Sequence, residues 1–361
     1  MLIALCAVLV ALNLAVGLAG GLARFGLPGP TGAALAFHGV LMVSAFFGSL
    51  ISLERALLLQ RRPALLVPLI AAAGGLLAWA GVPIEWPLGL WLVAALGLLG
   101  LQVGVALQRG WSLPRAIEML GAACWGLGLV LWLQGGVAHE ALPAWMGFLL
   151  LTILGLRRER MSDAPLSAAA RGWFGLGIGM VSAAVVLALV NTAYELPQWA
   201  WVDTPMLVFW LGAILLGLWL LAHDTEPRQW SAPAWTGLTA QALTLADAWL
   251  LAAGLLGALG RWLFMAAAGP AWHALLLGFS FCMVFGHAPL VVQALTGVQP
   301  RYAAWLRWPA WLLSASLLLR IAAAGFQHPV LLAIAGVGHV LAIALFAIGM
   351  VRAAAVGRQP G

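Results

Sequence analysis

Charged residues are scarce in this sequence. Asp, Glu, Lys and Arg together make up 8% of its 361 residues, whereas 64% are hydrophobic. A water-soluble domain has roughly a quarter of its residues charged, so the composition excludes that class of protein. The apolar runs are about 18 to 25 residues long, the length of helix that crosses roughly 30 Å of hydrocarbon. Because they also lack strict polar–apolar alternation, the sequence predicts an all-α, polytopic integral membrane protein rather than a β-barrel.

Lysine is absent altogether, so all seventeen basic residues are arginines. With eleven acidic residues, the formal net charge is +6. In a soluble protein this charge would suggest a nucleic-acid partner, but the arginines form no dense basic run and collect at the ends of the apolar runs. Arginines in that position set the orientation of a membrane protein. We therefore expect membrane lipid, and no nucleic acid, as a partner.

Cysteine occurs at only three positions, Cys6, Cys124 and Cys282, all inside apolar runs. They form neither C-x-x-C nor C-x-x-C-H, which disfavours a covalently attached c-type haem and a thiolate metal site. The sequence also lacks a Walker A motif, a nucleophile elbow, H-E-x-x-H and a Gly-rich dinucleotide fingerprint. Motifs therefore give no support to a hydrolase or a nucleotide-driven pump.

Twelve apolar runs predict about twelve transmembrane helices in a single domain, residues 1–361. The first run lacks a basic segment before it and a clear A-x-A site, so we interpret it as a retained helix rather than a signal peptide. The predicted spans cover residues 2–22, 33–59, 64–82, 87–107, 116–134, 141–157, 172–193, 205–222, 238–260, 271–296, 304–325 and 329–352.

The arginines predict the orientation of these spans. Only Arg24, Arg261 and Arg320 lie at one side, whereas fourteen arginines follow even-numbered spans or lie in the C-terminal tail. The positive-inside rule then predicts a cytoplasmic (inner) membrane protein with both termini in the cytoplasm. The fourteen are Arg55, Arg61, Arg62, Arg109, Arg115, Arg157, Arg158, Arg160, Arg171, Arg228, Arg301, Arg307, Arg352 and Arg358.

Histidines recur at the outer ends of helices four spans apart. His38 opens the second span, His139 precedes the sixth and His273 opens the tenth. This spacing suggests three four-helix repeats, of about residues 1–110, 111–230 and 231–361.

His38 and His273 are the best candidates for a cofactor site. They lie at similar predicted depth on helices that run in the same direction, so their imidazoles could ligate one haem iron from opposite faces. The alternative is that both cap helix starts at the membrane interface. Arg24, Arg261 and Arg320 lie on the same side, where they either bind the haem propionates or snorkel to the interface.

His287 lies fourteen residues after His273 on the same predicted helix. At 1.5 Å per residue the two lie roughly 21 Å apart and, at 3.6 residues per turn, on nearly the same face. One haem cannot use both as ordinary axial ligands, so His287 belongs either to a second metal or haem site or to a hydrogen bond in a helix bend before Pro289.

The other ionisable residues have ordinary explanations beside a functional one. His339 and His328 are expected to be packed or interfacial, and His139 and His223 to lie in loops. Asp247, with Gln241 on the same span, forms either a proton route or a buried hydrogen bond with a neighbouring helix. Local ion pairing with an adjoining arginine explains Glu54 and Glu159.

Three segments resemble a known family: HGVLMVSAFFGSLISLERALLL from His38, WMGFLLLTILGLRRER from Trp145, and HALLLGFSFCMVFGHAPLVVQALTG from His273. They resemble the NnrS-like membrane haem proteins, associated with nitric-oxide stress. The twelve-span plan more distantly resembles the catalytic subunit of haem–copper oxidases.

The oxidase resemblance implies a haem–copper-oxidase-like bundle with His38 and His273 as axial ligands of a low-spin haem, and Arg261 and Arg320 near its propionates. Leu275 stands where those oxidases have the second histidine of an H-x-H pair, and the seventh span contains no histidine. We therefore predict no oxygen- or NO-reducing haem–copper centre.

The sequence thus predicts a membrane haem b protein that serves nitric-oxide response, redox sensing or electron transfer. Its partners would be NO or another diatomic ligand, a quinone or a redox protein; whether it catalyses a reaction is left open. The alternative is a cofactor-free solute or proton transporter or channel, in which His287, Asp247 and His339 line the path.

Reporter tags test the predicted topology. Tags fused to either terminus are expected to report from the cytoplasm, because arginine-rich loops remain on that side of the membrane. The loop containing Arg157 to Arg160 should be labelled by an impermeant reagent only from inside. Termini on opposite sides would contradict the twelve-span topology, and with it the matched depth of His38 and His273.

Overall fold

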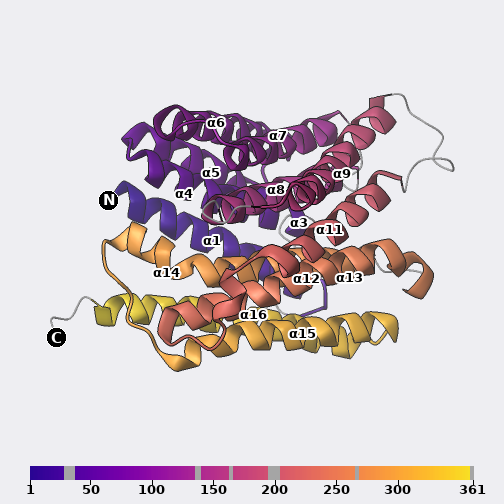
Figure 1. The fold of residues 1–361 in the computed structure, drawn as a ribbon. Coiled ribbons are helices and arrows are strands. Elements are labelled where there is room, and N and C mark those ends of the chain that lie inside the picture. Colours follow the sequence, from indigo (N-terminus) through magenta and orange to yellow (C-terminus); the bar gives the residue numbers. More distant parts are fainter. Residues whose placement is uncertain (28–36, 135–139, 162–165, 194–203, 265–267, 358–361) are drawn as a thin grey trace. The chain divides into compact units, whose positions relative to one another are not determined.

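The chain folds into helices throughout the part that the structure describes. The computed structural model describes residues 1–27, 37–134, 140–161, 166–193, 204–264 and 268–357 (Figure 1). Every secondary-structure element in these ranges is a helix. The predicted all-α fold class is therefore confirmed for the described residues.

Eleven helices among the described residues are long and apolar enough to cross a membrane. The prediction of a polytopic helical membrane protein is therefore confirmed at this level. The eleven are Leu2–Ala23, His38–Leu59, Arg62–Trp79, Glu85–Arg109, Leu113–Leu133, Ala168–Ala193, Thr204–His223, Ala234–Gly260, Gly269–Thr296, Ala304–Gly325 and Pro329–Gly357.

The predicted sixth span coincides with a further helix, α8 (Leu142–Arg160), which does not belong to these eleven. Its last four residues, Arg157–Arg160, are all charged, and this separates it from the apolar spans. Most of its preceding residues are buried among neighbouring helices. Twelve spans, and the three four-helix repeats, thus remain predictions.

The described chain forms two compact units. Unit 1 comprises Met1–Ser162 and Val185–Pro205, and unit 2 comprises Asp163–Ala184 and Met206–Gly361. Helix α9 (Ala168–Ala193) contributes to both. The other helices of unit 1 are α1 (Leu2–Ala23), α3 (His38–Val40), η1 (Leu41–Phe47), α4 (Gly48–Leu59), η2 (Arg62–Leu65), α5 (Leu66–Trp79), α6 (Glu85–Arg109), α7 (Leu113–Leu133) and α8.

Unit 2 contains the C-terminal helices, and Figure 1 shows α15 beside α16. Its helices are α11 (Thr204–His223), which begins at the unit boundary, η3 (Glu226–Gln229), α12 (Ala234–Phe264), α13 (Ala268–His273), η4 (Ala274–Phe281), α14 (Cys282–Thr296), η5 (Ala304–Arg307), α15 (Trp308–Gly325) and α16 (Pro329–Gly357).

In unit 1, α7 and α8 pack antiparallel along glycines. A Cβ atom at Gly128 would lie 2.5 Å from Trp145 Cδ1, and one at Gly121 would lie 2.5 Å from Thr152 Oγ1. Glycines let two membrane helices approach this closely, where van der Waals contact replaces the hydrophobic effect as the packing force. Gly128 therefore lies opposite Trp145, and Gly121, seven residues earlier, lies opposite Thr152, seven residues later. These two contacts fix the register of α7 against α8.

Trp125 of α7 joins three other helical segments of unit 1. Its indole Nε1–H donates to Ser44 Oγ of η1 at 3.0 Å, and its ring stacks on Phe148 of α8 with the ring centroids 5.0 Å apart. A Cβ atom at Gly48 of α4 would lie 2.6 Å from the same ring. Unit 2 uses the same kind of bond, because Trp249 Nε1 of α12 donates to Ser314 Oγ of α15 at 3.0 Å.

A Gly48→Ala substitution tests the contact with Trp125. The added methyl group overlaps the indole ring, so we expect unit 1 to lose about 1–3 kcal/mol of stability, as overpacked cores do. Thermal unfolding in detergent can be followed by the reaction of buried Cys124 with a thiol dye. Gly89→Ala is the matched control, because nothing lies within 4 Å of its Cβ position. Equal midpoints for the two variants would contradict the packing.

Candidate functional site

Two π-helical segments directly follow the two candidate ligand histidines. In unit 1, His38 opens α3 and η1 (Leu41–Phe47) follows. In unit 2, His273 ends α13 and η4 (Ala274–Phe281) follows. Short π-helical turns inside membrane or soluble helices are rare and are frequent at functional sites. The sequence pattern did not reveal them.

The imidazole of His38 is oriented by α1. Its Nδ1 lies 2.7 Å from the carbonyl oxygen of Gly17, and the side chain is half-buried. A Cβ atom at Gly21 would lie 2.8 Å from His38 Cε1. The open side of Gly21 and the carbonyl group of Gly17 therefore form a notch on α1 for the imidazole, while the open side of Gly17 faces Met42.

The imidazole of His273 makes a similar bond within its own helix. Its Nδ1 lies 2.7 Å from the carbonyl oxygen of Gly269. A carbonyl oxygen only accepts hydrogen bonds, so Nδ1 carries the proton in both histidines, and in the neutral ring Nε2 carries the lone pair. Metal-bound histidines usually have this arrangement, in which one ring nitrogen donates to a carbonyl and the other is the ligand.

His38 lies in unit 1 and His273 in unit 2, and each unit is described by itself. That the two share one haem remains a prediction. Of the three arginines proposed for the propionates, Arg24 is exposed just after α1 and Arg320 is half-buried on α15. Arg261 lies on α12, and its side chain falls outside the described part.

His287 is 8% exposed on α14, and its Nδ1 lies 2.8 Å from the carbonyl oxygen of Met283. The prediction that His273 and His287 lie on nearly the same face assumed 3.6 residues per turn. The π-helical segment η4 lies between them, so that assumption does not hold for this stretch. Pro289 lies inside α14, as the predicted bend requires, and nearby Thr239 donates to the Gly286 carbonyl at 3.0 Å. Both interpretations of His287 remain open.

A pocket of about 280 Å³ lies beside this part of α14 in unit 2. Gly286 and Pro289 line it together with Gln229, Gln293 and Gln299. No histidine is among its lining residues. It is therefore a recess near His287 with both polar and apolar lining residues, rather than part of a histidine site.

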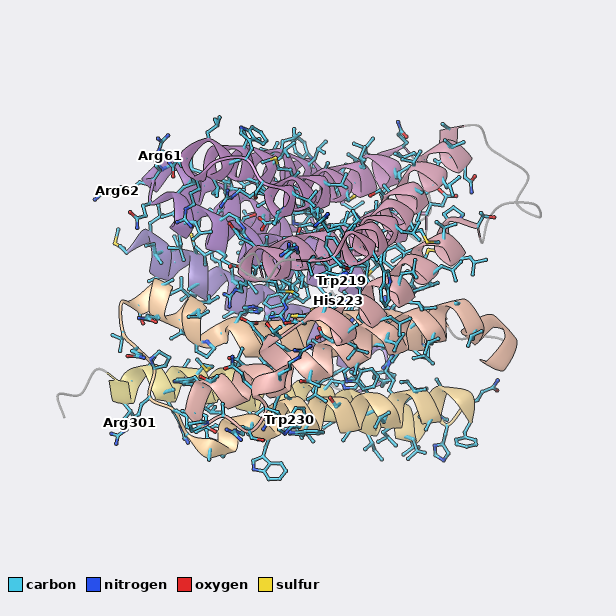
Figure 2. The ribbon with its side chains drawn as sticks, in the orientation of Figure 1. Arg61, Arg62, Trp219, His223, Trp230 and Arg301 are labelled. Carbon is cyan, nitrogen blue, oxygen red and sulfur yellow. The ribbon has the colours of Figure 1, made fainter. Side chains whose placement is uncertain are left out.

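The remaining histidines of unit 2 are packed or capping residues. His339 is 4% exposed and its Nδ1 lies 2.7 Å from Ser316 Oγ. His328 is exposed and its Nδ1 accepts from the Leu331 amide at 3.3 Å. His223, expected in a loop, ends α11 and stacks on Trp219 with the ring centroids 5.2 Å apart (Figure 2).

The other predicted groups are placed as follows. His139 lies outside the described residues. Asp247 is fully buried on α12, and Gln241 of the same helix is 9% exposed. Within the described ranges, no group of three or more His, Cys, Asp or Glu could hold a metal ion. A haem with two axial histidines needs no such group.

Sequence reasoning missed a buried ion pair in unit 1. Arg55 Nη2 of α4 lies 3.3 Å from Glu118 Oε2 of α7, and both side chains are at most 3% exposed. Glu159 pairs with Arg115 of α7 at 2.6 Å, whereas its adjoining arginine was the expected partner. The sequence did contain a sign of this pair. Glu118 lies inside the predicted fifth span, three residues after Arg115, and a carboxylate in that position needs a partner.

A model of a protein family, described as a domain of unknown function (DUF8744), matches residues 2–355 of the chain. The chain belongs to the DUF8744 family. No curated protein matches the chain, and no solved structure does either. The matched region of this chain extends over both units and contains His38 and His273.

A Gly21→Ala substitution tests how α1 orients His38 in the DUF8744 chain. The added methyl group would overlap the imidazole, so we expect the ring to leave the Gly17 carbonyl and to react severalfold faster with diethyl pyrocarbonate. Mass spectrometry of the modified peptide measures this rate, with His273 as the internal reference. Gly89→Ala serves again as control. An unchanged rate at His38 would contradict the notch.

Proposed function

We propose that this DUF8744 chain is a membrane b-type haem protein whose iron is held by His38 and His273. The observation that carries the proposal is that both imidazoles have the same tautomer, with the proton on Nδ1. In each, Nδ1 lies 2.7 Å from a backbone carbonyl oxygen, and a buried π-helical segment begins three residues after His38 and one residue after His273. This arrangement selects the tautomer whose Nε2 lone pair is suited to an iron ligand.

The surroundings of both histidines suit a haem. All seven residues of η1 are buried and largely apolar, and seven of the eight residues of η4 are buried. An apolar setting favours a macrocycle that makes few hydrogen bonds, and a hydrogen bond to Nδ1 raises the basicity of the ligand. Haem would supply a redox-active iron, while the protein orients the imidazoles and keeps water from them.

Arginines provide candidates for the propionates. Arg24, Arg261 and Arg320 are assigned to this role by their place near the predicted outer ends of the spans. A guanidinium binds a carboxylate through two hydrogen bonds, which makes arginine the usual partner for such a group. The proposal also includes a second metal or haem, with His287 as a ligand.

The resemblance to NnrS-like proteins supports a role in nitric-oxide response, redox sensing or electron transfer in the inner membrane, with both termini in the cytoplasm. NO or another diatomic ligand, a quinone or a redox protein would be the partner. A cofactor-free proton or solute transporter is the second candidate. It is favoured by the buried charges of unit 1, Arg55 and Glu118, since intramembrane ionisable residues often mark transport paths.

Purified protein, expressed with ample haem supply, is expected to contain a non-covalent b-type haem. Two neutral imidazoles should give a six-coordinate, low-spin spectrum, and pyridine extraction should release the whole chromophore. His38→Ala or His273→Ala should lose the haem or convert it to a five-coordinate form that binds NO or CO.

His287→Ala is the control, because His287 lies fourteen residues beyond His273, on α14 after the π-helical segment η4. The outer haem should stay in place in this variant. If His287→Ala abolished all haem while His38→Ala retained it, the ligand assignment would be wrong. Folded wild-type protein that is colourless would end the haem proposal and favour the transporter.

A further inference from the structure

Unit 1 contains a cluster of buried polar side chains that the haem proposal does not use. Five residues contribute to it, and each is between 0% and 3% exposed. They come from four different helices of unit 1. The five are Ser52 and Arg55 of α4, Gln102 of α6, Glu118 of α7 and Thr152 of α8.

Two side-chain contacts join α4 to α7, and α8 packs directly on α7, which brings four of them together. Gly48 packs on Trp125 and Arg55 pairs with Glu118, so α4 runs antiparallel to α7 and Ser52 lies at the level of Gly121. Thr152 Oγ1 occupies the space beside Gly121, 2.5 Å from the point where a Cβ atom at Gly121 would lie. The two hydroxyl groups therefore lie about one helical turn from the ion pair.

The packing of α6 on α7 adds Gln102. A Cβ atom at Gly126 of α7 would lie 3.7 Å from Ala95 Cβ and 3.8 Å from Leu92 Cδ1 of α6. Because α6 and α7 run antiparallel, moving back along α7 corresponds to moving forward along α6. Glu118 lies eight residues before Gly126 on α7, and Gln102 lies seven residues after Ala95 on α6. The Gln102 amide therefore lies at the level of the ion pair.

Most polar atoms of this cluster have unused hydrogen-bonding capacity. Within the described part of the protein, no hydrogen-bond partner is found for Ser52 Oγ, Thr152 Oγ1, Arg55 Nε, Glu118 Oε1 or either amide atom of Gln102. A buried polar group without a partner costs free energy comparable to a lost hydrogen bond. Groups of this kind that converge in an interior are the usual ligands of internal water.

The cluster adjoins one end of unit 1. On α7, Arg115 lies one turn before Glu118 and pairs with Glu159 of α8, and these two side chains are 15% and 32% exposed. Glu54 also lies within electrostatic range of Glu118. The same end of unit 1 carries Arg61 and Arg62, whose side chains project outward in Figure 2. The cluster thus has a short polar connection to solvent.

We propose that α4, α6, α7 and α8 enclose a hydrated site that binds water and one exchangeable proton, with Glu118 as the proton acceptor. The proton enters as hydronium past Arg115 and Glu159. It passes to the Glu118 carboxylate, which leaves a neutral carboxylic acid and a water molecule. Arg55 balances the charge of the deprotonated form, and Ser52, Gln102 and Thr152 hold the water. No oxidant or haem is required.

Charged side chains of both signs lie around Glu118. Arg55 of α4 and Arg115 of α7 are cationic, whereas Glu54 of α4 and Glu159 of α8 are anionic. Buried Arg157 of α8 lies two residues beyond Gly155, which packs against Glu118 Cγ. Gln102 of α6 is neutral. Three arginines and two carboxylates from α4, α7 and α8 therefore lie around the site, so charges of both signs act on it.

Infrared spectroscopy of the purified full-length protein tests this site. A carboxylic-acid C=O band is expected to appear as the pH falls and to shift promptly in D₂O, because water reaches the group. Glu118→Gln should remove that band, whereas Glu85→Gln, at an exposed carboxylate at the start of α6, should keep it. Thr152→Val, which preserves shape and charge, should slow the isotope shift severalfold even if Glu118→Gln fails to fold.

Three results would overturn the proposal. One is a spectrum in which wild type and folded Glu118→Gln have the same carboxyl bands at every pH. Another is a Glu118 band that does not shift in D₂O, which would mean a dry ion pair. The third is a band that responds to chloride or phosphate at constant pH, which would mean an anion site instead. Haem content is irrelevant to all three measurements.

Discussion

A polar side chain that enters the hydrocarbon layer is costly unless another protein group or an internal water bonds it, and the interior of both units depends on this constraint. The indole N–H of Trp125 donates to Ser44, and that of Trp249 to Ser314. The histidine rings use backbone carbonyl oxygens. The bonds of Trp125, Trp249 and His38 join different helices and are directional, whereas apolar contacts between membrane helices are not, so they help to determine which helix faces meet.

Glycine makes these bonds geometrically possible. The notch at Gly17 and Gly21 brings the backbone of α1 close enough for a carbonyl oxygen to reach His38. Gly48 similarly leaves space for the Trp125 ring between α4 and α8. The forty-three glycines of the chain include helix-interior positions whose low helix propensity is offset by close packing of this kind.

The Arg55–Glu118 pair is not explained by stability alone. Desolvation of two charges can exceed their mutual attraction, so a buried ion pair is weak evidence for stabilisation. Its side chains are also surrounded by polar groups from three further helical positions, Ser52, Gln102 and Thr152. Such a concentration of polar atoms inside an apolar bundle is better explained by hydration and proton binding than by packing.

The sequence by itself determined that the chain is helical, that it is a membrane protein and where its helices lie. The predicted spans 87–107 and 116–134 fall within two or three residues of α6 (Glu85–Arg109) and α7 (Leu113–Leu133), because helix length and apolarity are local properties. Only the tertiary structure decided that Arg115 meets Glu159, 44 residues away, and that π-helical turns follow His38 and His273. Helices that are apolar on every side carry no stripe that specifies a facing neighbour, so side-chain pairing across them depends on the packed bundle.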